Sequence, residues 1–310
     1  MESTLLNLTR TLKKQNFATI ESLNSALAQL TSAGSLDALE PMDLTEKEMA
    51  QELAYDAMEA DSPAKARKLA QKALALDPDC VDALVLLAGL ESRSPQEAIE
   101  SLRKAVQAGE RSLGADFIRK NKGYFWLILE TRPWMRAMQE LADMLRSQKL
   151  NDEAIRIYEK MLDLNPNDNQ GVRDLLLGLY LATSNLDSAA GLLGKYERDS
   201  SASFAWGRVL ERFLKGDLTQ AASALKKARK SNPHVELFLI AKKPLPDDLP
   251  EMYSLGSEEE AIVCMDSIGF AWTVHNDALL WLMDNWMKEQ IAAKGGRSPL
   301  NIRTHRKKST

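Results

Sequence analysis

Cys264 and His275 are the nucleophile and the base that lie nearest to each other in the sequence, and such a pair can form an activated nucleophile. On one continuous helix, their separation of eleven positions would place the two residues about 16 Å apart along the axis. A turn at Gly269 would be needed to bring them together. A thiol beside Met265 and Phe270 is more typical of a core residue, so we predict that the chain is not an enzyme.

The sequence also offers no metal or phosphate site. The three histidines, His234, His275 and His305, are scattered and lack the paired spacing of zinc ligands. Gly194-Lys195 is not preceded by the glycine-rich loop of a phosphate-binding motif. We therefore expect no cofactor and no metal.

Two charged segments are the strongest candidates for a binding site. In the first, Glu130, Arg132 and Arg136 flank Trp134, which follows Pro133. Arginine presents a planar fork of donors that suits carboxylates, and an exposed tryptophan supplies contact area.

The second segment lies one repeat later, where Asn169, Gln170 and Arg173 stand at the expected start of a helix. The candidate partner-binding residues are Arg132, Trp134, Arg136, Asn169, Gln170 and Arg173. They could form a polar pocket on a concave face that grips a peptide, through an acidic or C-terminal group. They could equally form an internal Glu–Arg network that braces the chain. We expect the aromatic run 124–126 to be core.

The elements that position these residues follow from a repeated spacing of apolar residues at plus four and plus seven, usually with proline at plus twelve. The four instances are Ala66/Ala70/Ala73/Pro78, Ala98/Leu102/Ala105, Ala154/Tyr158/Met161/Pro166 and Ala221/Leu225/Ala228/Pro233. Three such residues share one face of a helix, and the proline marks its end.

An apolar helix precedes each instance, which gives a helical hairpin repeated at about 34 residues, the tetratricopeptide period. The sequence therefore predicts an all-α, tetratricopeptide-like α-solenoid of about five helical hairpins, with an insertion and a helical C-terminal cap. Such a fold binds partners on its concave surface.

The predicted segments are an N-terminal helical segment and linker (1–44), two hairpins (45–110), an insertion (111–137), three hairpins (138–233), a helical cap (234–288) and a basic, disordered tail (289–310). The insertion follows from the 56 residues between Ala98 and Ala154, about 22 more than one repeat needs. An insertion in a solenoid generally lies on one face and is often functional.

The bulk composition agrees with a soluble, cytoplasmic protein. The formal net charge of −4 is too small to predict a class of partner. The two cysteines, Cys80 and Cys264, are far apart and are expected to be buried thiols in a reducing compartment. We see no signal peptide, and no apolar run reaches the roughly 20 residues of a membrane helix.

The tail from Gln290 to Thr310 carries six lysines and arginines and no acidic residue. A short basic tail is usually solvated. The alternative is a salt-sensitive contact with nucleic acid or with an acidic protein.

Several segments resemble known families. Asn232-Pro233-His234-Val235, then Gly256-Ser257 with Glu260-Ala261, then Ala278-Leu279 and Trp286 resemble the C-terminal half of the suppressor of tumorigenicity 7 family. Glu130–Ala137 and Asn165–Arg173 resemble segments of bacterial tetratricopeptide-like proteins of unassigned function. The resemblance covers about residues 40–286 and implies the fold, but no chemistry.

These observations favour a non-enzymatic scaffold or adaptor that binds a peptide or protein in the groove of a helical solenoid. The alternative is a nucleic-acid-associated adaptor that uses the basic tail. Membrane association is not expected.

Overall fold

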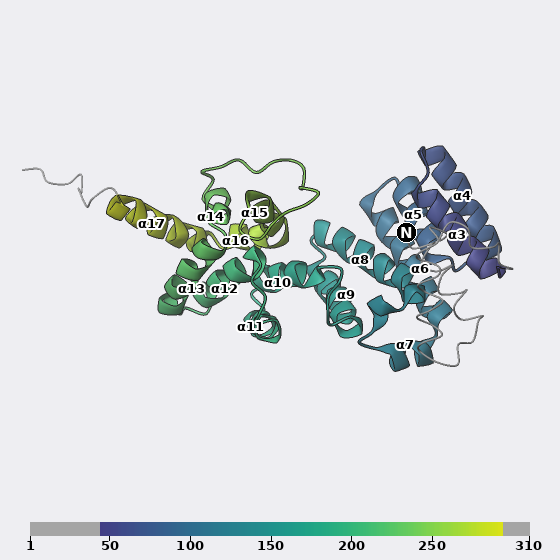
Figure 1. Ribbon diagram of the computed structural model, residues 1–310, viewed down its shortest axis with the longest axis horizontal. Helices are drawn as coiled ribbons and strands as arrows, with labels where there is room; N and C mark the ends of the chain where they lie inside the picture. The colour runs from purple at the N-terminus through teal and green to yellow at the C-terminus, as the bar shows by residue number, and fades with distance from the viewer. Residues whose placement is uncertain (1–43, 294–310) are drawn as a thin grey trace, which may run out of the picture. The chain divides into compact units, whose positions relative to one another are not determined.

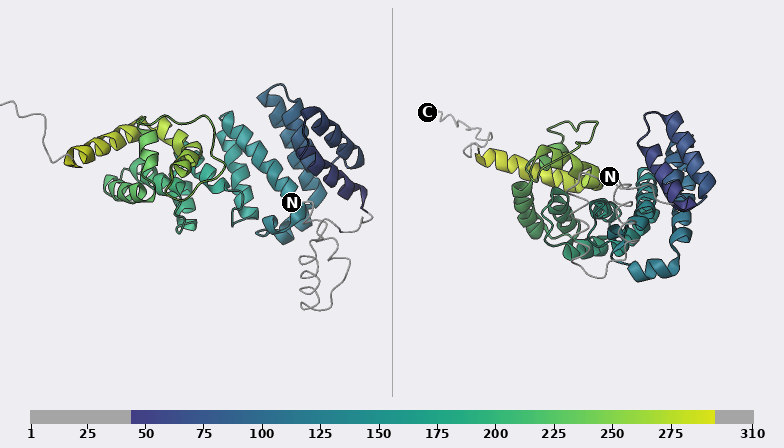
Figure 2. Two further views of the ribbon diagram at one scale, coloured as in Figure 1. Left: turned by 45° about the horizontal axis from the view of Figure 1, so that its top comes forward. Right: turned by 45° about the vertical axis from the view of Figure 1, so that its right-hand side comes forward.

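The structure of the chain is a computed structural model that describes residues 44–293. These residues form helices and no β-strand, which confirms the predicted all-α class. The chain divides into two compact units, residues 1–172 and 173–310. Figures 1 and 2 show both units, and each is described by itself below. The helices predicted before residue 34 lie outside the described residues, and so does the basic tail from residue 294 onward.

Unit 1 contains three helical hairpins, as the spacing of apolar residues predicts. They are α3 (Glu46–Met58) with α4 (Pro63–Leu76), α5 (Val81–Glu91) with α6 (Pro95–Leu113), and α8 (Arg132–Ser147) with α9 (Asn151–Leu164). The first helices of successive hairpins pack on each other, α3 on α5 and α5 on α8. The hairpins therefore stack in sequence order, as Figure 1 and the left view of Figure 2 show.

The repeated positions form the seam within each hairpin. Apart from the prolines, all the side chains of the predicted register are buried, from Ala98 at 7% exposed to Ala154 and Ala221 at 0%. Helices α4 and α9 end two residues before Pro78 and Pro166. Helix α6, whose sequence has Glu110 in place of the proline, continues to Leu113. Proline ends these helices because it cannot continue the backbone hydrogen bonding.

The insertion is shorter than the sequence predicts. After α6 the chain forms α7 (Ala115–Asn121) and the single 3-10 turns η2 (Phe125–Leu127) and η3 (Leu129–Thr131). Helix α8 then begins at Arg132, six residues before the hairpin start predicted at Met138. Pro133 explains the difference, because proline is favoured in the first turn of a helix. The segment Arg132–Ala137 is therefore the start of the third hairpin rather than part of the insertion.

Unit 2 contains two more hairpins and a cap. The hairpins are α10 (Val172–Ala182) with α11 (Leu186–Lys195), and α12 (Ala202–Leu214) with α13 (Leu218–Ser231). The cap is formed by α14 (His234–Leu239), α15 (Glu258–Cys264), the π-helical turn η4 (Met265–Gly269), α16 (Phe270–Val274) and α17 (Asn276–Ala293). The described residues thus contain the five predicted hairpins.

The turns inside three hairpins share one backbone device. Lys149, Ser184 and Gly216 each adopt a left-handed conformation, with φ of 60°, 57° and 79°, two residues before the second helix of the hairpin. Only Gly216 is the residue type that favours this conformation. Two of these three turns therefore adopt the left-handed conformation without a glycine.

The cap packs on unit 2 through a close backbone approach. A methyl group on Gly178 of α10 would come within 2.1 Å of the Ser267 carbonyl oxygen in the turn η4. Trp272 of α16 is fully buried and lies edge-on to Trp206 of α12, with ring centroids 6.3 Å apart. The cap thus extends the core of the last hairpin.

Candidate functional site

Trp134 is buried, with 1% of its surface exposed, so it does not supply the exposed contact area predicted for it. Its indole nitrogen donates to the Val106 carbonyl at 2.9 Å, and its ring lies against Gly109 of α6. Phe125 of the insertion packs beside it, with ring centroids 5.8 Å apart. Trp134 is therefore a packing residue that fixes α8 on α6.

Arg136 belongs to a polar network that joins the first helix of each of the three hairpins in unit 1. Its guanidinium donates to both carboxylate oxygens of Asp82, at 3.0 and 2.6 Å. The Asp82 side chain is 1% exposed and also accepts from Gln51 at 2.7 Å. This network links α3, α5 and α8. Its geometry corresponds to the internal brace that the sequence left open, with Asp82 as an acidic partner of Arg136.

Arg132 holds the insertion against the start of α8. Its Nε donates to the Trp126 carbonyl at 3.0 Å, and its guanidinium lies 5.1 Å from the centre of the Trp126 ring. Thr131 adds a bond from its hydroxyl to the Ile128 carbonyl at 2.7 Å. These contacts hold the part of the insertion that contains Trp126 against the start of α8.

The aromatic run that we expected to be core divides between core and surface. Phe125 is fully buried, whereas Tyr124 is 65% exposed and Leu127 is 70% exposed. The 3-10 turn places successive side chains on different sides, so only one of the three aromatic residues reaches the core completely.

Asn169 and Gln170 lie in the turn before α10. Asn169 is exposed, whereas Gln170 is half-buried and donates to Gln139 at 2.7 Å and to the Met135 carbonyl at 3.3 Å. Asp168 caps the turn by accepting from the Val172 amide at 2.9 Å. Gln170 thus joins the third hairpin of unit 1, and Asn169 alone of this pair faces solvent.

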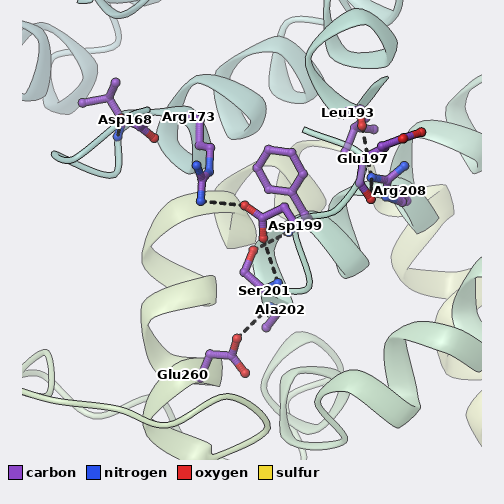
Figure 3. Close-up of polar contacts among 11 residues, drawn as sticks. Asp168, Arg173, Leu193, Glu197, Asp199, Ser201, Ala202, Arg208 and Glu260 are labelled. Carbon is purple, nitrogen blue, oxygen red and sulfur yellow. Dashed lines mark hydrogen bonds and ion pairs between the residues drawn. The ribbon is translucent and has the colours of Figure 1, made fainter. Parts of the chain in front are cut away.

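Arg173 forms an ion pair with Asp199, whose side chain is 7% exposed, at 2.8 Å. The guanidinium also lies 5.1 Å from the ring centre of Tyr196 and 5.9 Å from that of Phe204. Figure 3 shows Arg173 pointing at Asp199, which in turn accepts from the Ser201 amide at 2.8 Å. Arg173 is half-buried, with 30% of its side chain exposed, so it is partnered yet reachable from solvent.

A second carboxylate completes the start of α12. Glu260 is 3% exposed and accepts from the Ala202 amide at 2.9 Å, as Figure 3 shows. It also accepts from the Asn232 side chain at 2.9 Å and from the Gly256 amide at 2.6 Å. Three donors on three separate segments therefore converge on one buried carboxylate and tie the cap to the last hairpin.

Unit 1 contains a cavity of about 390 Å³ where three helices begin and α6 ends. Its apolar lining includes Tyr55, Val81, Leu113, Leu129, Pro133 and Trp134. Leu129 comes from the insertion, and Pro133 and Trp134 come from the segment that the sequence singled out. The insertion therefore forms one wall of the cavity.

The polar residues around this cavity are mostly acidic. Its lining contains Glu48, Asp77, Asp79 and Glu130 against a single cation, Lys47. Lys47 donates to Ser112 at 2.7 Å, and Asp79 pairs with Arg111 at 2.6 Å. An apolar floor with carboxylates around it suits an apolar side chain flanked by basic residues.

Unit 2 contains a wider cavity of about 750 Å³ beside Arg173. Its lining includes Tyr196, Asp199, Tyr253, Lys195 and Arg198. Positive and negative groups are mixed here, and the ion pair with Asp199 already satisfies part of the Arg173 fork. This cavity has neither the apolar floor nor the excess of acidic residues seen in unit 1.

The pair that could do chemistry is not activated. Cys264 is 1% exposed, and burial raises the pKa of its thiol well above the usual value, so the thiol stays protonated. A ring nitrogen of His275 lies 2.9 Å from the Leu181 carbonyl. Within residues 44–293, no group of three metal-ligating side chains could hold a metal ion. No described helix is both long and apolar enough to cross a membrane.

The residues that sequence reasoning missed are the buried carboxylates Asp82 and Asp199, whereas Glu260 was named there only for a family resemblance. Asp82 left a faint signal, because it stands alone in the apolar run Val81–Leu87 at the start of a helix. Asp199 stands in a loop, and its burial depends on residues far away in the sequence.

The sequence matches two models of known protein families. Both are described as tetratricopeptide repeat, and they match residues 52–112 and 136–168. The first match covers most of the first two hairpins, and the second covers most of the third. No curated protein matches the chain. With helical hairpins in both units and these repeats, the chain is a tetratricopeptide-like protein with an all-α, solenoid-type fold, the class of protein that generally mediates protein–protein interaction.

Proposed function

We propose that this chain is a non-enzymatic adaptor that holds a segment of a partner protein in the cavity of unit 1. The observation that carries the proposal is the apolar floor of that cavity, ringed by four carboxylates and one lysine. The partner segment that fits is an apolar side chain with lysine or arginine beside it. Burying one such side chain contributes about 1.5–3 kcal/mol, and the flanking charges add specificity and association rate.

The six residues predicted to contact a partner take different roles in this proposal. Trp134 contributes to the floor from within the core. Arg132, Arg136 and Gln170 hold the walls in place through contacts inside unit 1. The arginines led us to expect a partner with an acidic or C-terminal group, whereas the partner that we propose carries a basic group. Asn169 and Arg173 stay candidate contacts, tested below through Arg173.

The experiment selects peptides from a random library with the full chain. Selected peptides should carry an apolar residue next to lysine or arginine, and their binding should weaken as salt is raised. Leu113 is half-buried at the end of α6, so Leu113→Trp fills the cavity with little effect on the core and should abolish selection. Leu218→Trp is the matched control, because Leu218 is 52% exposed and lies in unit 2. Peptides rich in acidic residues, or equal binding by both variants, would exclude this site.

The buried carboxylate of Glu260 supports the proposed relationship with the suppressor of tumorigenicity 7 family, whereas the proposed relationship with bacterial tetratricopeptide-like proteins rests on residues 130–137 and 165–173. Asn232, Gly256 and Glu260, which carry the resemblance in the cap, meet at one hydrogen-bonded point. A cytoplasmic location is part of the same proposal. Because most of the basic tail lies outside the described residues, the nucleic-acid alternative stays a prediction from sequence.

A further inference from the structure

The last helix, α17, presents an unusual apolar stripe to solvent. Leu280 is 64% exposed, Met283 36%, Met287 46% and Ile291 49%. At 100° per residue these four positions fall within about 80° of one face and span about 16 Å of the helix. Scattered apolar residues on a surface are ordinary, but four on one helical face indicate a partner.

The opposite face of α17 is already used. Ala278 and Leu282 are fully buried, and Trp281 packs against Phe213 of α12 with ring centroids 5.3 Å apart. In Figure 1 the last turns of α17 extend beyond the neighbouring helices of unit 2. The stripe is therefore available along its length without any change in the core.

The stripe is complementary to itself when two copies of α17 lie antiparallel. A two-fold axis between residues 285 and 286 places Leu280 opposite Ile291 of the second copy. The same axis places Met283 within one residue, about 1.5 Å along the helix, of the level of Met287 of the second copy. Large apolar side chains thus meet at every level of the stripe, as the isologous interface of a two-fold dimer requires.

The charges beside the stripe follow the same symmetry. Asp284 and Lys288 are neighbours on one edge and form an ion pair within the helix. In the antiparallel arrangement, Asp284 of each copy lies within one residue, about 1.5 Å, of the level of Lys288 of the other, twice per dimer. A parallel arrangement would instead oppose Asp284 to Asp284 and Lys288 to Lys288, which is repulsive.

We propose that α17 is a self-association surface and that the chain forms a two-fold dimer through antiparallel pairing of this helix. The following segment of the same chain is a poorer occupant, because residues 294–310 contain only two large apolar residues, Leu300 and Ile302. One helical face places the interface at the small end of the range, below about 1,200 Å², so the dimer is expected to be concentration-dependent.

The test is sedimentation of the full chain over micromolar to millimolar concentrations. The wild type should pass from monomer to dimer, and Met283→Glu/Met287→Glu should stay monomeric while keeping its helical circular dichroism. Met252→Glu is the control, because Met252 is 83% exposed in the loop before α15 and should leave dimerisation unchanged. A wild type that is monomeric throughout, or a double variant that still dimerises, would overturn the proposal.

A charge exchange tests the antiparallel orientation. Asp284→Lys alone and Lys288→Asp alone should each weaken dimerisation about tenfold, because each creates a like-charge pair at both symmetric positions. The combined Asp284→Lys/Lys288→Asp variant should regain dimerisation, because both pairs become complementary again. If the combined variant is weaker than either single one, the helices do not pair in this register. Loss of dimerisation in these variants leaves peptide selection by unit 1 unaffected, so the two proposals can fail separately.

Discussion

The indole ring of Trp134 occupies the space where a side chain on Gly109 would lie. A methyl group on Gly109 would approach Trp134 Cδ1 to 2.3 Å and Cγ to 2.8 Å. Because Trp134 also bonds to the Val106 carbonyl, the ring cannot move away without losing that bond. This contact sets the distance between α6 and α8 and shapes the floor of the cavity in unit 1.

Gly109→Ala should therefore destabilise the chain by about 1–3 kcal/mol, the usual cost of overpacking a core. The measurement is the free energy of unfolding from urea melts. Gly89→Ala is the matched control, because Gly89 lies in helix α5 with no atom within 4 Å of an added methyl group. That control should gain about 0.5–1 kcal/mol, since alanine favours helix more than glycine does. Equal effects at the two positions would contradict the packing described here.

The register of the repeats can be tested at Ala154, which is fully buried at the seam of α8 and α9. Ala154→Leu should lower the free energy of unfolding by about 1–3 kcal/mol through overpacking. Arg156→Ala is a suitable control two residues away, because Arg156 is exposed. Lys160 would be a poor control, because its ammonium lies 4.7 Å from the centre of the Trp134 ring. A tolerated leucine at 154 would show that the helices are not closely packed there.

Arg136 and Arg173 test whether the charged segments brace the fold or contact a partner. Each arginine pairs with a carboxylate that is at most 7% exposed. Removing one partner of a buried pair costs about 3–5 kcal/mol, so Arg136→Ala should approach that range. Arg173→Ala should cost less, because 30% of the arginine side chain faces solvent.

Replacement of these arginines by lysine gives a second measurement. Arg136→Lys should rescue poorly, because lysine cannot reproduce the two parallel bonds to Asp82. The free energy of unfolding should be highest for the wild type, lower for Arg136→Lys and lowest for Arg136→Ala. If Arg173→Ala changes stability by less than about 0.5 kcal/mol, Arg173 does not brace the fold and a role in partner contact is supported.

The helical repeats could be predicted from sequence because their cause is local. Ala66, Ala70 and Ala73 share a helical face by spacing alone, and Pro78 ends that helix by its own chemistry. The same kind of argument failed at the start of α8. The spacing of the repeats places Pro133 in the predicted insertion, although proline is equally favoured in the first turn of a helix.

The candidate site could be predicted only in part, because burial depends on contacts between distant residues. Arg136 and Asp82 are 54 positions apart, and nothing near either residue reveals the other. The charged neighbours of Trp134 predict an exposed side chain. Its ring is instead buried against Gly109, which lies 25 positions earlier and has no side chain to exclude it. The sequence draws attention to these residues, but the identity of the residues that contact them requires the fold.

The buried thiols predict how stability changes at alkaline pH. Burial raises the pKa of Cys80 from 9.0 to about 12, and the Cys264 thiol is raised in the same direction. Between the unfolded and folded values, the folded chain holds more protons than the unfolded chain. The stabilising contribution is therefore complete below pH 9 and is lost as pH rises through the interval up to about 12.

Urea melts of the full chain at roughly pH 8 and roughly pH 10 should show this loss, at up to about 1.4 kcal/mol per pH unit for each thiol. Cys80→Ala should reduce the loss, because it removes the thiol that donates to the Ala50 carbonyl at 3.6 Å, and the smaller alanine fits the same space. Cys80→Ala/Cys264→Ala should reduce it further, while Arg156→Ala should show the wild-type dependence. The folded wild type should also resist thiol reagents at pH 8 until urea unfolds it. A Cys80 thiol that reacts at once in the folded chain, or melts whose pH dependence is the same with and without the two cysteines, would show that these thiols are not held in their protonated form by the core.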